Sequence, residues 1–282
     1  MEVGIGLPNA VEGVDRAGTV EWARRAEEAG FSSLGTLGRI AFPNYEELVS
    51  LAAAAAVTER VRLVTDVLLA PLHRNTALLA KQAATLDSLS EGRLVLGLAV
   101  GGREDDYEVS GVEFHERGRI FDRQLEELVE IWEGDRVGPL THSGDRPRML
   151  IGGGVDASLR RAARHADGWT QGGAGPDPFR GSVAKLNEYW QAEGREGSPY
   201  TMALFYFGLG EGAEEHARED LGHYYAWLGE ELANMIIESA ATDAGTVKSY
   251  LETFEEAGAD EVICFPVTPD PGQVDLLADA AL

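Results

Sequence analysis

The stretch NTALLAKQAATLDSLSEGRLVLGLAVGG, residues 75–102, predicts a helix that leads straight into a buried strand. Residues 75–92 form the helical part and end at Gly92, and a glycine directly after a helix is a common stop signal. Residues 93–102 are the most strand-like run in the chain. Their continuous apolar character is typical of a strand covered on both faces, as in a parallel sheet.

The same order of strand and helix recurs along the whole chain. Strands are predicted at 3–9, 32–38, 60–71, 93–102, 148–154, 167–173, 200–210 and 260–268. Helices are predicted at 19–30, 45–58, 75–92, 116–134, 156–166, 177–194, 213–240, 245–258 and 273–282. This alternation implies right-handed crossovers and a parallel sheet.

Eight such units in 282 residues predict a (β/α)8 barrel, a TIM barrel, for which about 250 residues is typical. The alternative is an open doubly wound sheet, which more often has roughly five to seven strands. The two long segments 102–116 and 221–237 would be insertions after the fourth and seventh strands.

The charge of the chain narrows the classes of ligand. Its 24 Lys and Arg residues stand against 48 Asp and Glu residues, which gives a net charge of −24. Such a protein would repel nucleic acids and anionic membrane surfaces. Because the acidic residues are spread along the chain, we interpret them as a solvated surface. An anionic ligand would therefore need local hydrogen-bond donors to hold it.

Other global features predict a cytoplasmic protein with one domain, residues 1–282. No apolar run approaches the roughly 20 residues that span a bilayer. The start, MEVGIGLPN, lacks the basic segment of a signal peptide. The single Cys264 excludes an internal disulfide framework and a multi-cysteine metal site. The strand ends also lack the ligand clusters of a metal-dependent hydrolase, so we expect no metal.

Small residues gather where the predicted strands end. In a (β/α)8 barrel the active site lies at the C-terminal ends of the strands. Glycines there could simply turn the chain, or they could leave room for a large flat ligand across the barrel mouth. Because several strands share this feature, we favour the ligand. The strand ends are Leu7-Pro8-Asn9, Asp66-Val67-Leu68, Gly101-Gly102, Gly152-Gly153-Gly154, Gly172-Gly173 and Gly208-Leu209-Gly210.

The segment GGGVDAS, residues 152–158, suggests an anion site at the start of a helix. Consecutive backbone N–H groups and the helix dipole favour a phosphate there, and the Ser158 hydroxyl could add a hydrogen bond. The alternative is that Asp156 caps the helix without any ligand. The segment is neither a P-loop nor a G-x-G-x-x-G fingerprint, so it does not by itself indicate ATP or NAD.

These segments resemble the luciferase-like monooxygenase superfamily. Residues 79–102 and 116–132 carry the resemblance, with IGGGVDASLRRAARHADGW (151–169) and YLETFEEAGADEVICF (250–265). The resemblance implies a (β/α)8 barrel that uses reduced FMN or the deazaflavin coenzyme F420 on a small organic substrate. It also implies a separate reductase that supplies the reduced cofactor, and a homodimer.

The resemblance also implies which residues contact the cofactor. The family often has a non-prolyl cis peptide at the end of the third strand, which would fall within Asp66-Val67-Leu68, with Val67–Leu68 as the favoured position. Gly153, Gly154 and Ser158 would hold the cofactor phosphate, with Arg117 near it. The full implied set is Leu7, Pro8, Asp66, Val67, Leu68, Ala99, Gly101, Gly102, Arg117, Gly152, Gly153, Gly154, Ser158 and Gly172.

The chain departs from the family in its candidate proton donors. Many F420-using relatives have an Asp-His pair after the second strand, whereas this chain reads TLGRIAFPNYE at 36–46. We therefore favour FMN and oxygen over hydride transfer with F420, and keep a non-catalytic flavin-binding protein as a further alternative. His73 and His115 are the candidate catalytic residues, although a loop histidine is usually a surface residue. Cys264 is expected to be a small buried hydrophobe.

The insertion 221–237 is rich in apolar and aromatic residues, among them Tyr224, Tyr225, Trp227 and Met235. As a lid over the barrel mouth it would keep water from the reacting groups. The alternatives are that these residues belong to the core or to a dimer interface.

Overall fold

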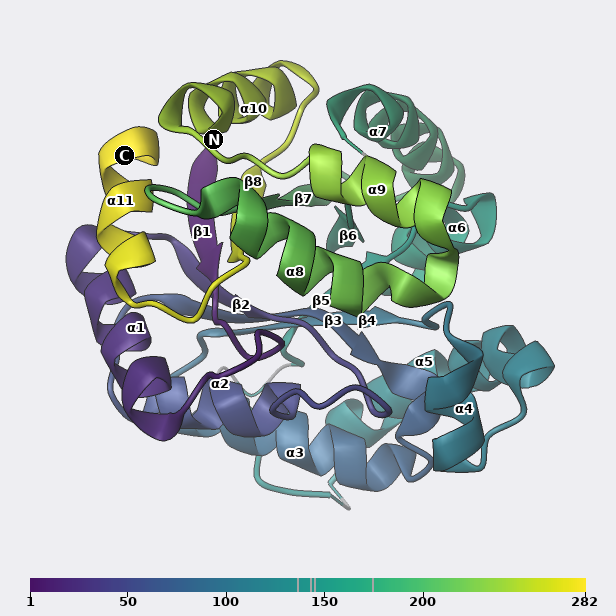
Figure 1. The fold of residues 1–282 in the computed structure, drawn as a ribbon. Helices are drawn as coiled ribbons and strands as arrows, with labels where there is room; N and C mark the ends of the chain where they lie inside the picture. The colour runs from purple at the N-terminus through teal and green to yellow at the C-terminus, as the bar shows by residue number, and fades with distance from the viewer. Residues whose placement is uncertain (136, 143, 145, 174) are drawn as a thin grey trace.

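The strands of the computed structural model, which describes residues 1–135, 137–142, 144, 146–173 and 175–282, form a closed parallel barrel in chain order (Figure 1). The last strand pairs with the first, so the sheet has no edge. This confirms the predicted (β/α)8 barrel and excludes the open sheet. The strands are β1 (Glu2–Gly6), β2 (Ser33–Thr36), β3 (Arg62–Leu69), β4 (Leu94–Ala99), β5 (Arg148–Gly152), β6 (Gly168–Gln171), β7 (Tyr200–Phe207) and β8 (Glu261–Pro266).

One set of helices surrounds the barrel, and further helices lie in the segments that follow β3, β4 and β7. Around the barrel lie α1 (Arg16–Ala29), α2 (Glu47–Ala55), α3 (Thr76–Leu89), α5 (Arg117–Glu133), α6 (Asp156–His165), α7 (Pro176–Ala192), α10 (Ala244–Glu256) and α11 (Gly272–Ala281). The short helices η1 (Ala70–Leu72), α4 (Glu104–Ser110) and η2 (Phe114–Glu116) follow β3 and β4. After β7 come α8 (Ala213–Tyr225), η3 (Ala226–Leu228) and α9 (Glu230–Glu238).

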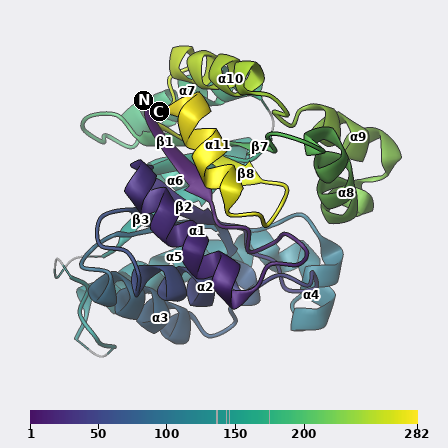
Figure 2. The same ribbon diagram turned by 60° about the vertical axis from the view of Figure 1, so that its left-hand side comes forward.

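The predicted insertions are therefore present, with two differences in their structure. The segment after β4 contains helix α4, which the polar sequence did not predict. The predicted helix 213–240 is broken at Gly229, whose φ of 83° does not belong to a right-handed helix. Figure 2 shows α8 and α9 projecting beyond the barrel on the same side as α4.

Apolar side chains alternate between the two faces of the barrel wall. One set faces the surrounding helices, and the other fills the barrel interior with Val64, Val95, Leu150, Met202 and Ile263. The alternation follows from the two-residue period of a strand. The filled interior means that a ligand cannot pass through the barrel.

The N-terminal end of the barrel is closed by a polar network around Glu261, the first residue of β8. Its carboxylate is 1% exposed and accepts hydrogen bonds from the hydroxyls of Ser33, at 2.6 Å, and Tyr200, at 2.8 Å. Arg62 lies 3.0 Å from the same carboxylate. Ser33, Arg62 and Tyr200 also begin their strands, so this network ties four strand starts together and leaves the opposite end as the route for a ligand.

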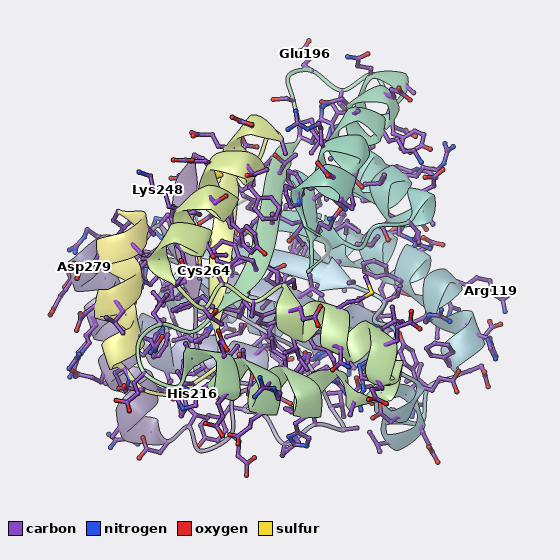
Figure 3. All side chains as sticks on the ribbon, turned by 45° about the horizontal axis from the view of Figure 1, so that its top comes forward. Arg119, Glu196, His216, Lys248, Cys264 and Asp279 are labelled. Atoms are coloured by element: carbon purple, nitrogen blue, oxygen red, sulfur yellow. The ribbon has the colours of Figure 1, made fainter. Side chains whose placement is uncertain are left out.

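Charged side chains lie on the surface, and the single cysteine lies in the interior, as the sequence predicted. Figure 3 shows Arg119, Glu196, Lys248 and Asp279 at the periphery and Cys264 inside the molecule. Cys264 is fully buried, which confirms its expected structural role, and burial raises the pKa of its thiol. Within the described residues, no helix has the length and apolar character required to span a bilayer.

Candidate active site

A cavity of about 190 Å³ lies at the C-terminal ends of the strands, and we call it the mouth cavity. Asp66, Val67 and Gly172 line it from the barrel, and Tyr224 and Trp227 line it from the segment after β7. Pockets for drug-sized ligands usually measure roughly 300–1,000 Å³. A large ring system would therefore enter only after the segment over the cavity moves aside.

The glycines at the strand ends serve two different purposes. Gly101, Gly102 and Gly172 line the mouth cavity, as predicted for a ligand site. Gly152 instead makes room for a side chain of the protein, because a Cβ atom there would lie 2.8 Å from Cγ1 of Val67. The same Cβ position is 3.3 Å from Cβ of Ala99. The mouth is thus narrower than the sequence alone suggested.

The backbone of β3 is irregular where it reaches the cavity. The peptide bond between Asp66 and Val67 is cis, so it falls within the predicted segment 66–68, one residue before the favoured position at Val67–Leu68. Pairing with β4 moves three residues along β3, from Thr65 to Leu68, for two residues along β4. The extra residue forms a β-bulge, and both residues of the cis pair line the cavity. Pairing with β4 resumes at Leu68, which holds the bulge in position.

Asp66 is the buried acid of the mouth cavity. It is 4% exposed, and its Oδ1 atom accepts a hydrogen bond of 2.8 Å from the hydroxyl of Thr170. Its Oδ2 atom has no hydrogen-bond partner among the described residues. Burial raises the pKa of Asp66 to about 7, against the lowering effect of the Thr170 hydroxyl. Near neutral pH this carboxyl group can therefore both donate and accept a proton.

The N-terminal end of α6 is accessible, but one of the N–H groups predicted to bind a phosphate already forms a hydrogen bond within the protein. Gly153 donates its N–H to the carbonyl of Thr170 at 3.2 Å, so this amide is already engaged within the sheet. Asp156 is not the N-cap as proposed: Val155 holds that position, and no side chain caps the helix. The carboxylate of Asp156 pairs with Lys185 at 3.0 Å instead. Gly154 is exposed, and a Cβ atom there would meet nothing within 4 Å.

Four predicted cofactor residues at the ends of β1, β3 and β4 do not line the mouth cavity, namely Leu7, Pro8, Leu68 and Ala99. Leu7 and Leu68 are buried in the core between the barrel and its helices. Pro8 is buried in the loop after β1 and does not line the cavity. Successive side chains of a strand point to opposite faces, and the side chains of Leu7 and Leu68 point outward, toward the helices. The sequence does not determine, to a single residue, which side chain at a strand end points inward.

The predicted charged and proton-donating residues also lie outside the cavity lining. His73 is partly buried, with Nε2 3.7 Å from Glu47, and His115 is exposed beside the ring of Phe114. Arg117 donates to the carbonyl of Phe114 at 2.8 Å and stacks on its ring. The structure thus brings neither histidine to the cavity, where Asp66 is present instead.

An aromatic lid covers the cavity, as the sequence indicated. Tyr224, Tyr225 and Trp227, at the end of α8 and in η3, all line it, whereas Met235 on α9 is exposed. The hydroxyls of Tyr225 and Tyr206 are 2.6 Å apart, and burial raises the pKa of both phenols. These phenols stay neutral and tie the lid to β7.

A buried ion pair on the cavity wall was missed by sequence reasoning. Arg39, directly after β2, donates from Nε to Asp106 of α4 at 2.6 Å, and the two side chains are 5% and 1% exposed. Asp106 also accepts the backbone N–H groups of Ile40 and Ala41. The only sequence signal was an arginine within 36–46, the segment that lacks the expected histidine. Pairing partners 67 residues apart cannot be inferred from that signal.

Asn9 fixes the loop that carries this arginine. Its amide nitrogen donates to the carbonyls of Leu37 and Tyr45, at 2.9 and 3.0 Å, and its oxygen accepts from the N–H of Leu37 at 3.1 Å. Replacing Asn9 by alanine is expected to lower the free energy of unfolding by roughly 2–3 kcal/mol, because it leaves buried polar groups unpaired. Urea unfolding measures this. The partly buried Asn44, whose amide also bonds to the carbonyl of Tyr45, is the control, and an equal loss in Asn44→Ala would contradict the assignment.

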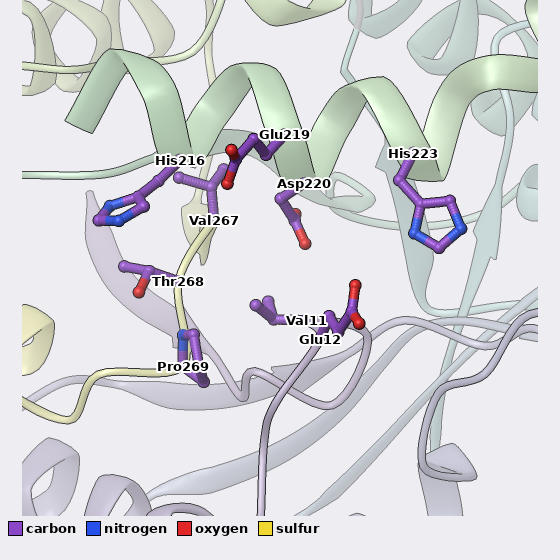
Figure 4. Close-up of a pocket in the computed structure, with 9 residues that line it drawn as sticks. All are labelled: Val11, Glu12, His216, Glu219, Asp220, His223, Val267, Thr268 and Pro269. Carbon is purple, nitrogen blue, oxygen red and sulfur yellow. The ribbon is translucent and has the colours of Figure 1, made fainter. Parts of the chain in front are cut away.

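A second cleft, of about 240 Å³, lies between α8 and the loops after β1 and β8 (Figure 4). His216, Glu219, Asp220 and His223 reach it from α8, and Glu12 lies opposite. Burial and the nearby Glu12 raise the pKa of Asp220 to about 7. In the part of the chain that the structure describes, no group of three or more His, Cys, Asp or Glu side chains is arranged to hold a metal ion. With three carboxyl groups and no arginine in its lining, this cleft is a poor site for an anionic cofactor.

The fold and the site together define a (β/α)8 barrel with a lidded cavity at its mouth and an uncapped helix start beside it. The sequence profile of the luciferase-like monooxygenases matches residues 1–262. The chain therefore belongs to the luciferase-like monooxygenase family, a family of oxidoreductases.

Individual relatives agree with this assignment. The uncharacterized protein Rv0940c of Mycobacterium tuberculosis (strain ATCC 25618 / H37Rv) is 34% identical over 214 residues, which cover 64% of this chain and 73% of that protein. The pyrimidine monooxygenase RutA of Escherichia coli (strain SMS-3-5 / SECEC) is 26% identical over 222 residues, 71% of this chain and 59% of that protein.

Solved structures share the fold. The monooxygenase RslO1 from Streptomyces bottropensis superposes with a TM-score of 0.82 at 21% identity, covering 100% of this chain and 98% of that one. An F420-dependent secondary alcohol dehydrogenase, in complex with an F420-acetone adduct, gives a TM-score of 0.83 at 19% identity, covering 99% and 98%. At such identities the likeness concerns the fold alone.

Proposed function

We propose that this protein is a flavin-dependent oxidoreductase that uses reduced FMN and molecular oxygen on a small organic substrate. The observation that carries the proposal is the placement of the mouth cavity beside the open start of α6. Gly172 lines the cavity directly after β6, and β6 is paired with β5, the strand that leads into α6. A ring in the cavity and a phosphate at the helix start would thus occupy neighbouring strand ends.

Two features of the chain fit such a cofactor. A Cβ atom on Gly153 would lie 2.7 Å from Oγ of Ser158, so only a glycine keeps the loop close to this hydroxyl. At the other end, Oδ2 of Asp66 is buried in the cavity, and no described residue forms a hydrogen bond with it. Gly154, Ser158 and the first turn of α6 would hold the phosphate, and the cis pair 66–67 with Gly101 and Gly172 would border the ring.

When bound, FMN would supply the redox chemistry and the activation of oxygen. The residues of the chain would orient the reactants, exclude water and move a proton. Tyr224, Tyr225 and Trp227 would close the cavity and keep bulk water out. Asp66 would hold a proton on Oδ2, and the Thr170 hydroxyl would fix the orientation of the carboxyl group through Oδ1. His73 and His115 are replaced in this role by Asp66.

Titrations with FMN, reduced FMN and F420 would test this proposal, read by absorbance and by the quenching of tryptophan fluorescence. We expect FMN in one or both redox states to bind more tightly than F420, because the chain lacks the Asp-His pair after β2. Tighter binding of F420 would replace the proposal with hydride transfer from the deazaflavin. Binding of neither would remove the cofactor assignment. Binding without turnover, when a reductase and oxygen are supplied, would favour a flavin-binding protein.

The cellular context is proposed on the family alone. A separate reductase would supply the reduced cofactor, and the protein would act in the cytoplasm as a homodimer. Val49 on α2 and Leu89 on α3 are 68% and 73% exposed, and such apolar side chains on adjoining helices would suit a subunit contact. Analytical ultracentrifugation would decide the oligomeric state.

A further inference from the structure

Arg39 has hydrogen-bonding capacity that the protein does not use. Its Nε atom donates to Asp106, and its Nη2 atom is 3.7 Å from Asp105, too far for a hydrogen bond. Neither Nη1 nor Nη2 makes a hydrogen bond of normal geometry among the described residues, and both atoms are buried, with the phenol of Tyr224 as an interacting neighbour of the guanidinium. Buried donors without partners are unfavourable, so this edge of the guanidinium is suited to an acceptor that the protein itself lacks.

The position of Arg39 directs this edge toward a ligand. The arginine lines the mouth cavity, and its guanidinium carbon is 5.4 Å from the ring centre of Tyr224 and 5.6 Å from that of Phe42. Asp106 fixes the arginine from the Nε side. The remaining Nη1–Nη2 edge is a planar fork, and a carboxylate matches such a fork with two parallel hydrogen bonds. Tyr224 belongs to the lid, so the arginine and the lid lie next to each other at the cavity.

The charges around the mouth cavity are nearly balanced, in contrast to the net charge of −24 for the whole chain. Arg39 and Arg103 line it together with Asp66 and Asp106, and the pKa of Asp66 is raised to about 7 by burial. Arg39 pairs with Asp106 and Arg103 pairs with Asp105, so these charges balance, and a protonated Asp66 adds no negative charge that would repel an acid. The rest of its lining is largely apolar, with Leu204 and the aromatic lid as examples. By contrast, the second cleft offers carboxylates and no arginine.

We propose that the Nη edge of Arg39 binds the carboxylate of the substrate, so that the protein acts on small organic acids whose remaining body is apolar. This inference rests on the proposed function, because it assigns the substrate class of the same cavity. Arg39 is then a specificity-determining residue, and Asp106 positions it.

Isothermal titration calorimetry with benzoate and benzamide tests this inference, because the two probes have the same shape and differ in charge. Wild-type protein is expected to bind benzoate at least about tenfold more tightly than benzamide, the preference that charge-assisted hydrogen bonds give. Arg39→Met should abolish the preference. Since that variant leaves Asp106 buried without its partner, the double variant Arg39→Met/Asp106→Asn is measured as well. Asparagine can still accept the N–H groups of residues 40 and 41.

Arg119→Met is the matched control, because it removes an exposed arginine on α5 and should keep the preference for benzoate. Equal binding of the two probes by wild type, no binding of benzoate, or a preference that survives in both Arg39 variants would overturn the inference. The same holds if these variants lose affinity for FMN instead of benzoate, because the arginine would then serve the cofactor. An Arg39-dependent preference in a protein that binds neither FMN nor F420 would support the acid site and reject the flavin proposal.

Discussion

Replacing Asp66 by asparagine is expected to make the protein more stable than wild type at alkaline pH, and progressively less so as the pH falls. The pKa of Asp66 is raised from 3.8 to about 7 in the folded state by burial. The folded state therefore binds more protons than the unfolded state between these values. The resulting stabilisation of wild type is fully present below about pH 4 and is lost as the pH rises through about 7. Each pKa unit corresponds to about 1.4 kcal/mol, so the change across the window amounts to at most about 4 kcal/mol.

Urea unfolding of both proteins across this range measures the effect as a difference, which removes the contributions of all other carboxyl groups. The comparison with wild type is necessary because the pKa of Asp220 is also raised to about 7, so this residue titrates over the same pH range. Asp279→Asn, at an exposed position on α11, is the control and should give a difference that does not vary with pH (Figure 3). A difference that is equally flat for Asp66→Asn would show that Asp66 has an ordinary pKa when folded.

The protonation of Asp66 that changes the stability is also relevant to catalysis. A carboxyl group that is half protonated near pH 7 is suited to general acid and base catalysis at neutral pH. Its lack of a partner on Oδ2 is unfavourable for the folded state, and such groups tend to lie at functional sites. The mouth cavity and the unpaired Oδ2 atom of Asp66 therefore belong to the same candidate site at the end of β3.

The barrel could be predicted because each of its units carries a local signal. The helix and strand in 75–102, for example, correspond to α3 and β4. The break at Gly229 was missed because α8 and α9 are both helical and only one residue in the connection has a special backbone angle. The helix α4 was missed because its sequence, EDDYEVS, is polar and its position depends on the pairing of Asp106 with Arg39.

The parts of the site that could be predicted are those that depend on strand ends and on glycines, which can be recognised in the sequence. The cavity glycines, the lid aromatics and the approximate place of the cis bond followed from strand ends and from the family resemblance. Arg39 and the role of Asp66 did not, because both depend on burial and on partners distant in sequence. Thr170, for instance, lies 104 residues from Asp66. The histidines were chosen for their intrinsic pKa, which says nothing about whether a side chain reaches the cavity.

Replacing Gly153 by alanine is expected to abolish the preference of the protein for FMN over riboflavin. Gly153 has a φ of 118°, a conformation that an alanine adopts only with strain. The added Cβ would also lie 2.7 Å from Oγ of Ser158. The loop before α6 must therefore shift, and the amides and hydroxyl proposed to hold the phosphate would move apart. Because a phosphate at a helix start gains charge-assisted hydrogen bonds, the ratio of the two affinities should fall about ten- to a hundredfold.

Fluorescence titrations with FMN and riboflavin measure this ratio, and riboflavin provides an internal reference because it lacks the phosphate. Its affinity should change little in Gly153→Ala if the barrel mouth is intact. Gly181→Ala, at an exposed position on α7, is the control: a Cβ there also meets nothing within 4 Å, so the preference for FMN should remain. If Gly153→Ala lost affinity for both flavins equally, the loop would support the fold rather than the phosphate. If wild type bound riboflavin as tightly as FMN, the start of α6 would have no role in holding the cofactor.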